Sequence, residues 1–347
     1  MLAVPAGASA ATKVVLMGTP PTKEGKALGN LGADVNDFFP NGTTVHVGDQ
    51  VQFFPVGFHD AHFPKKGGSA APLLLPTGQP VAGINDAAGN PFWFNGQAQV
   101  GFNPALGKSN LGKTLTYNGT KAVNSGLPPE GNAPPKPMTV KFTKAGTFAF
   151  FCDVHPGMKG TVKVLAKSKK IPSAKADAKA VTNQLARDLK VAKALPKKTA
   201  AAGTVDVGEA GKYGVEYFGM LPATQTVPVG TTLTFKMTPG TREVHTATFG
   251  PGNPDKEPAS YLGKIAGTFT SGPTPAGEGI YPSDPPPAGP ASLSPTLHGN
   301  GFWNSGALDL VAASPLPAAS TVTFGTAGTY DFYCLIHPFM KGTVVVQ

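Results

Sequence analysis

Apolar and polar residues alternate with a period of two along several short stretches of the chain. Residues 45–53 follow this pattern around a turn at Gly48, and residues 139–142 and 147–151 follow it on either side of Gly146. Such alternation is typical of half-buried β-strands, and the glycine turns between the stretches predict hairpins. The pattern therefore predicts an all-β protein built from short strands.

One segment, residues 166–200, has helical periodicity instead. It is rich in alanine and lysine, contains no glycine, and has Pro172 and Pro196 on either side of its central part. Its larger apolar residues recur at roughly helical spacing and would form one face of a helix: Val181, Leu185, Leu189 and Leu195. We therefore predict a helical linker over residues 166–203.

The two parts of the chain on either side of this linker repeat each other. Residues 146–164 have the sequence GTFAFFCDVHPGMKGTVKV, and residues 328–346 have the sequence GTYDFYCLIHPFMKGTVVV. Residues 43–63 and 225–249 also correspond, each with a valine-rich stretch followed by a histidine. Self-similarity of this length indicates a tandem duplication.

The duplication predicts the domain organisation. We expect one Greek-key β-sandwich at 11–165 and a second at 204–347, joined by the basic helical linker. Residues 64–137 and 250–320 are rich in glycine and proline, and we predict that they are long loop insertions with little regular structure. In each insertion one tryptophan is expected to anchor the loop, Trp93 in the sequence GNPFWFNG and Trp303 in the similar sequence GNGFWNSG.

Composition and charge narrow the classes of function. The 347 residues include 44 glycines and 36 prolines without a three-residue period, which excludes collagen and favours turn-rich β-domains. The formal net charge is +9, and residues 166–200 contain ten basic and two acidic residues. We expect this segment to be a solvated connector, and the alternative is a basic helix that contacts an anionic surface. The flanks of this segment lack the interleaved basic and aromatic residues of nucleic-acid-binding proteins, so we expect no nucleic-acid partner. No apolar run of the sequence is long enough for a transmembrane helix.

The first ten residues are predicted to be a signal-peptide remnant or a disordered tail. Ala8, Ser9 and Ala10 end a weakly apolar stretch with the small-x-small pattern of a signal-peptidase site. We therefore expect an exported protein, located in the periplasm, outside the cell or at the cell surface. Exported proteins commonly contain disulfides, but the two cysteines lie in separate repeats, which indicates another role for each thiol.

Each repeat carries its one cysteine in the same short motif. The motif is Cys152-x-x-His155-x-x-Met158 in the first repeat and Cys334-x-x-His337-x-x-Met340 in the second. A thiolate, an imidazole and a thioether in one loop between two strands can converge on one ion, and soft sulfur ligands favour copper. A second histidine from a different strand would complete a plane of two histidines and one cysteine, with methionine as the axial ligand.

Alignment of the repeats identifies the second histidine. His59 in the sequence HDAHF aligns with His245 in HTATF, whereas His62 aligns with Thr248 and His46 aligns with a proline. The sequence thus predicts two copper ions per chain, one in each repeat. Zinc is disfavoured because its structural sites rarely include methionine. A nucleophilic cysteine is disfavoured because a metal-bound thiolate is not free to attack a substrate.

In these motifs each repeat resembles a cupredoxin, a member of the type 1 blue-copper family. The Cys-x-x-His-x-x-Met loop is similar to that of amicyanins, and HDAHF and HTATF resemble the plastocyanin and amicyanin segment with the first histidine ligand. The resemblance covers both ends of each repeat and leaves the insertions unmatched. It implies copper ligation by His59, Cys152, His155 and Met158 in the first repeat, and by His245, Cys334, His337 and Met340 in the second.

The chain departs from the family pattern at two positions in each repeat. Asp60 and Thr246 follow the first histidine, where the family usually has asparagine. Val154 and Ile336 precede the second histidine, where the family usually has proline. Groups at these positions shape the hydrogen bonds to the thiolate, so we expect the two coppers to be inequivalent.

The resemblance implies a protein that transfers electrons and is not an enzyme. Four protein ligands leave copper no open position for a substrate. The family also has a solvent-facing apolar patch beside the second histidine, which predicts that protein redox partners dock at Pro156, Pro338 and Phe339. One alternative is a copper-binding protein that delivers the metal. Another, less favoured, is a copper oxidoreductase of the oxidase or nitrite reductase type, which would need more histidines than this assignment leaves over.

Overall fold

The computed structural model describes residues 11–128, 136–269, 271–311, 314 and 316–347. The prediction for residues 1–10 therefore lies outside the described residues. The chain divides into two compact units, and each consists of three segments. The described residues of unit 1 fall within Met1–Lys26, Val35–Leu73 and Pro104–Arg187, and those of unit 2 within Ala27–Asp34, Leu74–Asn103 and Asp188–Gln347. The units differ in extent from the predicted domains, because residues 74–103 group with unit 2.

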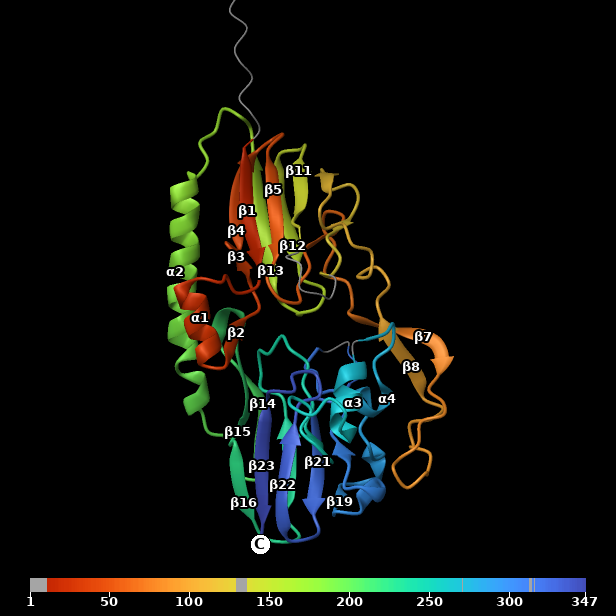
Figure 1. Ribbon diagram of the computed structural model, residues 1–347. Coiled ribbons are helices and arrows are strands. Elements are labelled where there is room, and N and C mark those ends of the chain that lie inside the picture. The colour runs from red at the N-terminus through yellow and green to blue at the C-terminus, as the bar shows by residue number, and fades with distance from the viewer. Residues whose placement is uncertain (1–10, 129–135, 270, 312–313, 315) are drawn as a thin grey trace, which may run out of the picture. The chain divides into compact units, whose positions relative to one another are not determined.

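Unit 1 is a sandwich of two five-stranded sheets (Figure 1). One sheet has the order β3-β1-β5-β11-β9, with strands Phe38–Phe39, Thr12–Met17, Gln50–Pro55, Met138–Phe142 and Thr114–Tyr117. The other has the order β10-β6-β12-β13-β4, with strands Val123–Asn124, His62–Phe63, Gly146–Phe151, Lys159–Leu165 and Gly42–His46. β1 runs parallel to β5 and β13 parallel to β4, whereas β12 and β13 form an antiparallel hairpin.

Unit 2 is a second sandwich, and its strands follow one another in the same spatial order. One sheet has the order β19-β21-β17-β14-β15-β2, with strands Ala291–Leu293, Ala319–Phe324, Thr232–Lys236, Thr204–Ala210, Val215–Leu221 and Ala33–Val35. The other has the order β16-β23-β22-β18-β20, with strands Thr224–Val227, Lys341–Val346, Gly328–Tyr333, Thr248–Phe249 and Trp303–Asn304. β14 runs parallel to β17, and β22 and β23 form the hairpin that corresponds to β12 and β13.

The alternating sequence pattern reflects the sandwich cores. In β12, Phe148 and Phe150 are buried, whereas Thr147 and Ala149 on the opposite face are exposed. Phe150 packs at the centre of the unit 1 core, edge-on to Phe53 of the facing sheet at a ring distance of 5.1 Å. The structure therefore confirms the predicted fold class of two β-sandwiches, in which strands such as β5, β12 and β13 bury every second side chain.

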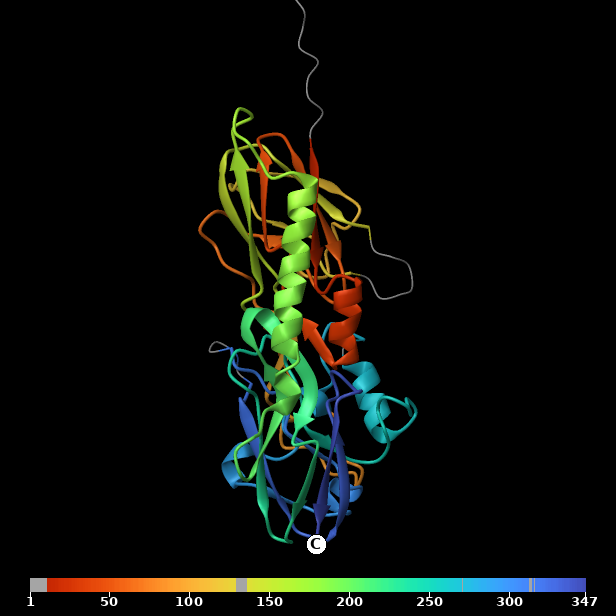
Figure 2. The same ribbon diagram turned by 90° about the vertical axis from the view of Figure 1, so that its left-hand side faces the viewer.

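The basic linker contains a helix, as predicted. Helix α2 covers Ala174–Ala192, and a short 3₁₀ helix, η1, follows at Leu195–Lys197 (Figure 2). Leu185 and Leu195 are buried on its apolar side. Within unit 1, Asp177 of α2 pairs with Lys13 of β1 at 2.6 Å. In the described part of the chain, no helix has the length and apolar character needed to cross a membrane.

The prediction of irregular insertions was wrong. The first insertion contains the antiparallel hairpin of β7 (Leu74–Pro80) and β8 (Ala98–Phe102), as well as β9 and β10. The second contains helices α3 (Tyr261–Thr268) and α4 (Gly277–Ile280), the strands β19 and β20, and the 3₁₀ helices η3 (Pro286–Ala288) and η4 (Leu297–Gly299). Two further helices lie outside the insertions, α1 (Lys23–Asn30) and η2 (Lys212–Gly214). Glycine and proline content indicates turns, but the insertions also carry apolar residues that form buried clusters of their own.

The similarity between the Trp93 and Trp303 segments does not correspond to an equivalent position in the two sandwiches. The counterpart of β20, which begins with Trp303, is β10, because the two strands pair with the equivalent strands β18 and β6. Ser125 directly follows β10, and Ser305 directly follows β20. The Ser125 hydroxyl accepts a 2.9 Å hydrogen bond from the Ala61 N–H, and the Ser305 hydroxyl accepts one of the same length from the Ala247 N–H. Ala61 and Ala247 each lie two residues after the first predicted histidine ligand of their unit. Trp93 instead packs in a cluster of unit 2.

Candidate metal centres

The loop after β12 brings Cys152, His155 and Met158 together in unit 1. The Met158 N–H donates to the His155 carbonyl at 3.0 Å, and the Cys152 N–H donates to the Met158 carbonyl at 3.1 Å. These hydrogen bonds close the loop into a tight turn between β12 and β13. Gly157 has a φ of +88°, a left-handed conformation that favours glycine, at the point where the turn reverses.

The loop after β22 has the same hydrogen bonds in unit 2. The Met340 N–H donates to the His337 carbonyl at 2.8 Å, and the Cys334 N–H donates to the Met340 carbonyl at 3.1 Å. Phe339 stands where unit 1 has Gly157, and its side chain is 58% exposed. The two loops therefore share one backbone arrangement and differ in the residue that faces solvent.

In unit 1 the upstream histidine meets this loop. His59 lies shortly before β6, and its Nδ1 is 3.9 Å from the Cys152 Sγ. The His155 Nδ1 is 3.5 Å from the same sulfur, and the two imidazole rings have centroids 4.5 Å apart. One ligand atom from each of the three residues lies within 4.8 Å of the others, and all three residues are buried.

Unit 2 places His245, Cys334 and His337 in the same way. The His245 Nδ1 is 3.9 Å and the His337 Nδ1 is 3.8 Å from the Cys334 Sγ, and the two nitrogens are 3.1 Å apart. Donor atoms that each lie about 2 Å from one ion are separated by about 3–4 Å. The separations in both groups therefore suit a single metal ion.

The predicted methionine ligands are buried beside these groups. Met158 belongs to the same core cluster as Cys152, and Met340 belongs to the same cluster as Cys334. Both cysteines are free thiols. Imidazole nitrogen with thiolate and thioether sulfur is a soft donor set, so the residues present fit copper.

A hydrogen bond ties the two ligand-bearing segments together in each unit. In unit 1 the Asp153 N–H donates to the Asp60 Oδ1 at 2.7 Å. In unit 2 the Leu335 N–H donates to the Thr246 Oγ1 at 2.8 Å. In both cases the residue after the cysteine bonds to the side chain after the first histidine. Asp60 and Thr246 thus perform the same structural role with different charge.

The electrostatic surroundings of the two thiols differ. Burial, and then repulsion from the Asp153 carboxylate, raise the pKa of Asp60 to about 6. Burial also raises the pKa of the Cys152 thiol. The pKa of the Cys334 thiol is lowered, because its hydrogen bond with His245, that histidine's charge and the N–H groups of Thr246 and His337 outweigh burial. The Cys334 sulfur thus accepts hydrogen bonds from the N–H groups of Thr246 and His337, at 3.3 and 3.4 Å.

Several residues around the second site were not predicted from the sequence. Phe218 of β15 packs edge-on against His337 and His245, with ring distances of 4.9 and 5.7 Å, and its ring centroid lies 5.9 Å from that of Phe339. The Glu243 carboxylate is 3.6 Å from the His337 Nε2. Phe218 lies outside the segments that the repeats share, and Glu243 lies within one of them where the first repeat has Gly57, so alignment of the repeats gives no signal for either residue.

Among the predicted docking residues, Phe339 and Pro156 are exposed and Pro338 is half-buried. The histidines that were not predicted as ligands contact carboxylates. His46 lies 3.3 Å from Asp49, and His62 lies 3.0 Å from Asp153. The third, His298, lies between two aspartates of unit 2.

Comparisons with known proteins give short or weak similarities. No family model matches the chain. An amicyanin from Paracoccus denitrificans is 59% identical over 29 residues, which are 8% of this chain and 22% of that protein. An amicyanin from Paracoccus versutus is 52% identical over 29 residues. The chain thus spans about a fifth of the length of the curated relatives that it matches.

Two solved structures illustrate the structural similarities. A reduced Cu(I) form of an amicyanin variant has 20% sequence identity, with coverage of 44% of this chain and 90% of that chain and a TM-score of 0.22. A purple cupredoxin from Nitrosopumilus maritimus has 15% identity, with coverage of 42% of this chain and 99% of that chain and a TM-score of 0.19. These similarities are too weak to assign the sites, and the assignment of the ligand residues depends on the geometry of the chain itself.

The hydrogen bond between the Leu335 N–H and the Thr246 side chain in unit 2 leads to a testable prediction. Thr246→Val keeps the shape of the side chain but leaves the buried Leu335 N–H without its acceptor, which costs about 1–3 kcal/mol. We expect metal-free protein with this substitution to lose that amount of unfolding free energy in urea titrations. Thr226→Val, the same change at an exposed position of β16, is the control. Equal stability of the two variants would show that the hydrogen bond is not important.

Proposed function

We propose that this chain, as a member of the cupredoxin family, transfers electrons through one copper ion in each sandwich. The observation that carries the proposal is the pair of His–Cys–His groups, one in each unit, whose ligand atoms lie within 4.8 Å of one another. His59, Cys152 and His155 would hold one ion, and His245, Cys334 and His337 the other. Met158 and Met340 would supply the axial sulfur.

Electron transfer suits the way these residues are held. Bound copper supplies a one-electron couple between Cu(I) and Cu(II). The ligand loops are closed by backbone hydrogen bonds and tied together by Asp60 or Thr246, so the protein fixes the ligand positions independently of the metal charge. A site that does not rearrange between two redox states has a low barrier to electron exchange.

The proposal favours a carrier over an enzyme. Catalysis at a metal needs an open coordination position for substrate or water, and the predicted ligands fill four positions. Each remaining histidine contacts a carboxylate rather than another histidine: His46, His62 and His298. Copper delivery is the second candidate, supported by the partial exposure of His337, whose side chain is 20% exposed.

Copper binding and its stoichiometry test this proposal directly. We expect about two copper ions per chain, each with the intense thiolate-to-copper absorption of a type 1 site. Cys152→Ser should remove one ion and leave the spectrum of the second site unchanged, and Cys334→Ser should give the complementary result. Copper analysis with visible and EPR spectroscopy measures both. A wild-type stoichiometry of one, or loss of both ions in either variant, would contradict the proposal.

We further propose that electrons pass through the aromatic surface at His337. Phe218 and Phe339 pack around the partly exposed imidazole and leave an apolar face beside it. Such a face lets a redox partner approach the imidazole through apolar contacts, and the Glu243 carboxylate is 3.6 Å from the His337 Nε2. The partner is a protein with a complementary apolar surface around its own redox centre.

A charge on this surface should slow electron transfer without changing the copper site. Phe339→Glu is expected to lower the electron self-exchange rate of the copper protein by about tenfold, because like charges meet at the contact. NMR line broadening in mixtures of oxidised and reduced protein measures this rate. Val229→Glu, at an exposed valine in the turn before β17, is the control. Equal rates for the two variants would exclude Phe339 from the electron path.

The basic linker is proposed to contact an anionic surface, in keeping with an exported protein at a cell surface. Its lysines at 167, 169, 170, 175 and 179 are all exposed. None of them occurs in an ion pair among those found in the described residues. Their charges are therefore available to an anionic surface such as a phosphatidylglycerol membrane.

The linker proposal predicts strongly salt-dependent binding. The wild-type protein should bind vesicles containing phosphatidylglycerol at low salt, with much weaker binding at about 0.3 M salt, because exposed charges are then screened over a few ångströms. Replacing Lys167, Lys169, Lys170, Lys175 and Lys179 by Gln should abolish the binding in a sedimentation assay. The same five changes to Arg should preserve it. Unchanged binding by the glutamine variant would make the segment a plain connector.

A further inference from the structure

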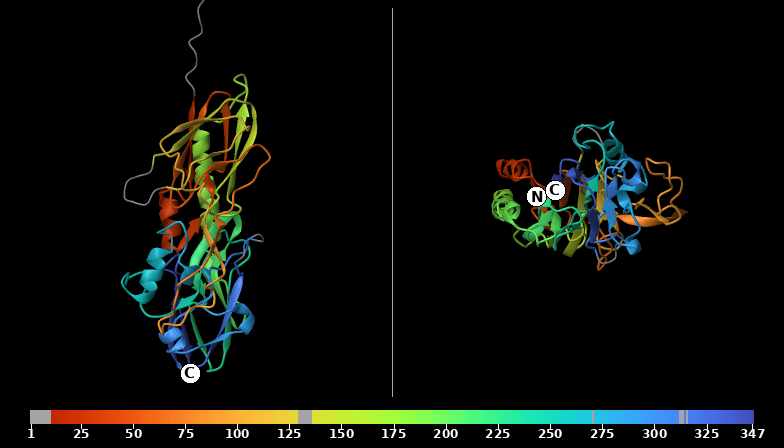
Figure 3. Two further views of the ribbon diagram at one scale, coloured as in Figure 1. Left: turned by 90° about the vertical axis from the view of Figure 1, so that its right-hand side faces the viewer. Right: turned by 90° about the horizontal axis from the view of Figure 1, so that it is seen from below.

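Residues 74–103 of the first repeat, here called the arm, form part of the core of unit 2. The arm contains the hairpin of β7 and β8, drawn in orange beside α4 in Figures 1 and 3. Val81, Phe92 and Phe94 are almost fully buried in a cluster of unit 2. The same cluster contains Tyr333 and Leu335, the two residues that flank Cys334. The arm therefore shares a core with the strand end that carries the cysteine.

Leu335 connects this shared core to the two segments that carry the predicted ligands of unit 2. The Leu335 side chain is 1% exposed within the cluster, while its N–H donates to the Thr246 Oγ1 next to His245. A shift of the Leu335 side chain would thus move the hydrogen bond that ties the two ligand segments together. Phe94 stacks on Tyr281 at a ring distance of 5.3 Å and forms part of the cluster that holds Leu335 in place.

A second connection runs through polar groups. The Trp93 Nε1 donates to the Pro282 carbonyl at 2.9 Å. Pro282 forms a β-bridge with Ser305, whose hydroxyl accepts the Ala247 N–H at 2.9 Å. Ala247 lies two residues after His245. The arm thus reaches the histidine segment of the second site as well as the cysteine segment.

The arm is fastened to unit 2 at a third place. The His298 ring lies between two carboxylates, with its Nδ1 3.3 Å from Asp86 of the arm and its Nε2 3.4 Å from Asp284. Burial lowers the pKa of His298, but the two carboxylates outweigh it and raise that pKa. The next residue, Gly299, has a φ of +84°, and a Cβ there would lie 2.5 Å from the Ala88 nitrogen. A side chain at position 299 would therefore collide with the arm backbone, and glycine at this position avoids the collision.

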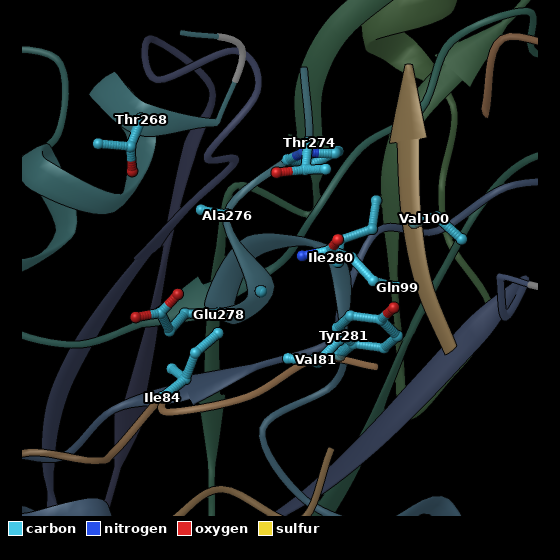
Figure 4. Close-up of a pocket in the computed structure, with 12 residues that line it drawn as sticks. Val81, Ile84, Gln99, Val100, Thr268, Thr274, Ala276, Glu278, Ile280 and Tyr281 are labelled. Carbon is cyan, nitrogen blue, oxygen red and sulfur yellow. The ribbon is translucent and has the colours of Figure 1, made fainter. Parts of the chain in front are cut away.

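A pocket also lies beside the arm. The pocket, of about 280 Å³, lies between the arm and the region of α4, lined by Val81, Ile84 and Val100 on one side and by Ala276, Glu278 and Tyr281 on the other (Figure 4). The pocket shares Val81, Ile84 and Tyr281 with the buried cluster, so the arm packs against unit 2 without filling all of the space around it.

We propose that the arm of the first repeat is a positioning element for the second metal site, and that Trp93 and Phe94 are its positioning residues. The inference rests on the proposed function in that the site is taken to hold copper. In both units a serine of the same repeat accepts the N–H of the histidine segment, Ser125 in unit 1 and Ser305 in unit 2, and unit 2 adds the arm, whose Trp93 bonds to Pro282, the β-bridge partner of Ser305. The second site thus depends on a segment from the other repeat, and removing the support of the arm should loosen the Cys334 loop and leave the Cys152 loop unchanged.

The test uses full-length, metal-free protein and compares the alkylation rates of the two buried cysteines. Phe94→Ala removes a fully buried ring, and Trp93→Phe removes the N–H to Pro282 while keeping an aromatic ring. We expect alkylation of Cys334 by iodoacetamide to accelerate about tenfold in Phe94→Ala and by a smaller factor in Trp93→Phe, because local opening exposes the thiol. Cys152, resolved by mass spectrometry of the peptides, should react at the wild-type rate.

Gln97→Ala, at an exposed position of the arm, is the control and should change neither rate. A Cys334 rate at the wild-type value in both variants would overturn the proposal, as would equal acceleration of the two cysteines. A second readout is the spectrum of copper-loaded protein, in which both variants should change the absorption of the second site alone. Failure of wild-type protein to bind copper would refute the proposed function, whereas the alkylation rates would still decide the role of the arm.

Discussion

The geometry of both candidate metal centres depends on one hydrogen bond that the two units share. In unit 1 the Asp153 N–H donates to the Asp60 side chain at 2.7 Å, and in unit 2 the Leu335 N–H donates to the Thr246 side chain at 2.8 Å. In each unit the donor follows the cysteine and the acceptor follows the first histidine. The two segments are about ninety residues apart in the sequence, and strand pairing brings them together, β6 with β12 and β18 with β22. The shared hydrogen bond then holds the residue next to each first histidine against the residue next to each cysteine. The sandwich supplies the strands that bring both segments to one end.

The same backbone arrangement supports two different sites. Asp60 places a buried carboxylate beside the first thiol, whereas Thr246 places a neutral hydroxyl beside the second. The Phe218 and Phe339 rings surround the second site, and the arm of the first repeat shares its core. Hydrogen bonds to the sulfur and nearby charge tune a metal site. The two proposed copper sites are therefore expected to have distinct redox properties.

Much of this could be predicted from the sequence, because the ligand motif is local and occurs twice. The spacing of Cys152, His155 and Met158 follows from one turn, and alignment with the second repeat identified His59. Phe218 and the arm could not be predicted, because their contacts join segments that no shared motif connects. The apparent match of Trp93 with Trp303 was misleading for the same reason: similar residues pack in different surroundings, and the strand pairing, not the sequence, identifies the equivalent segment.

Anomalous diffraction at the copper absorption edge, from crystals of the full-length protein grown with copper, tests the central claim most directly. The account predicts two strong peaks per chain, one within bonding distance of His59, Cys152 and His155 and one within bonding distance of His245, Cys334 and His337. A single peak, or copper bound elsewhere with either cysteine uncoordinated, would contradict it.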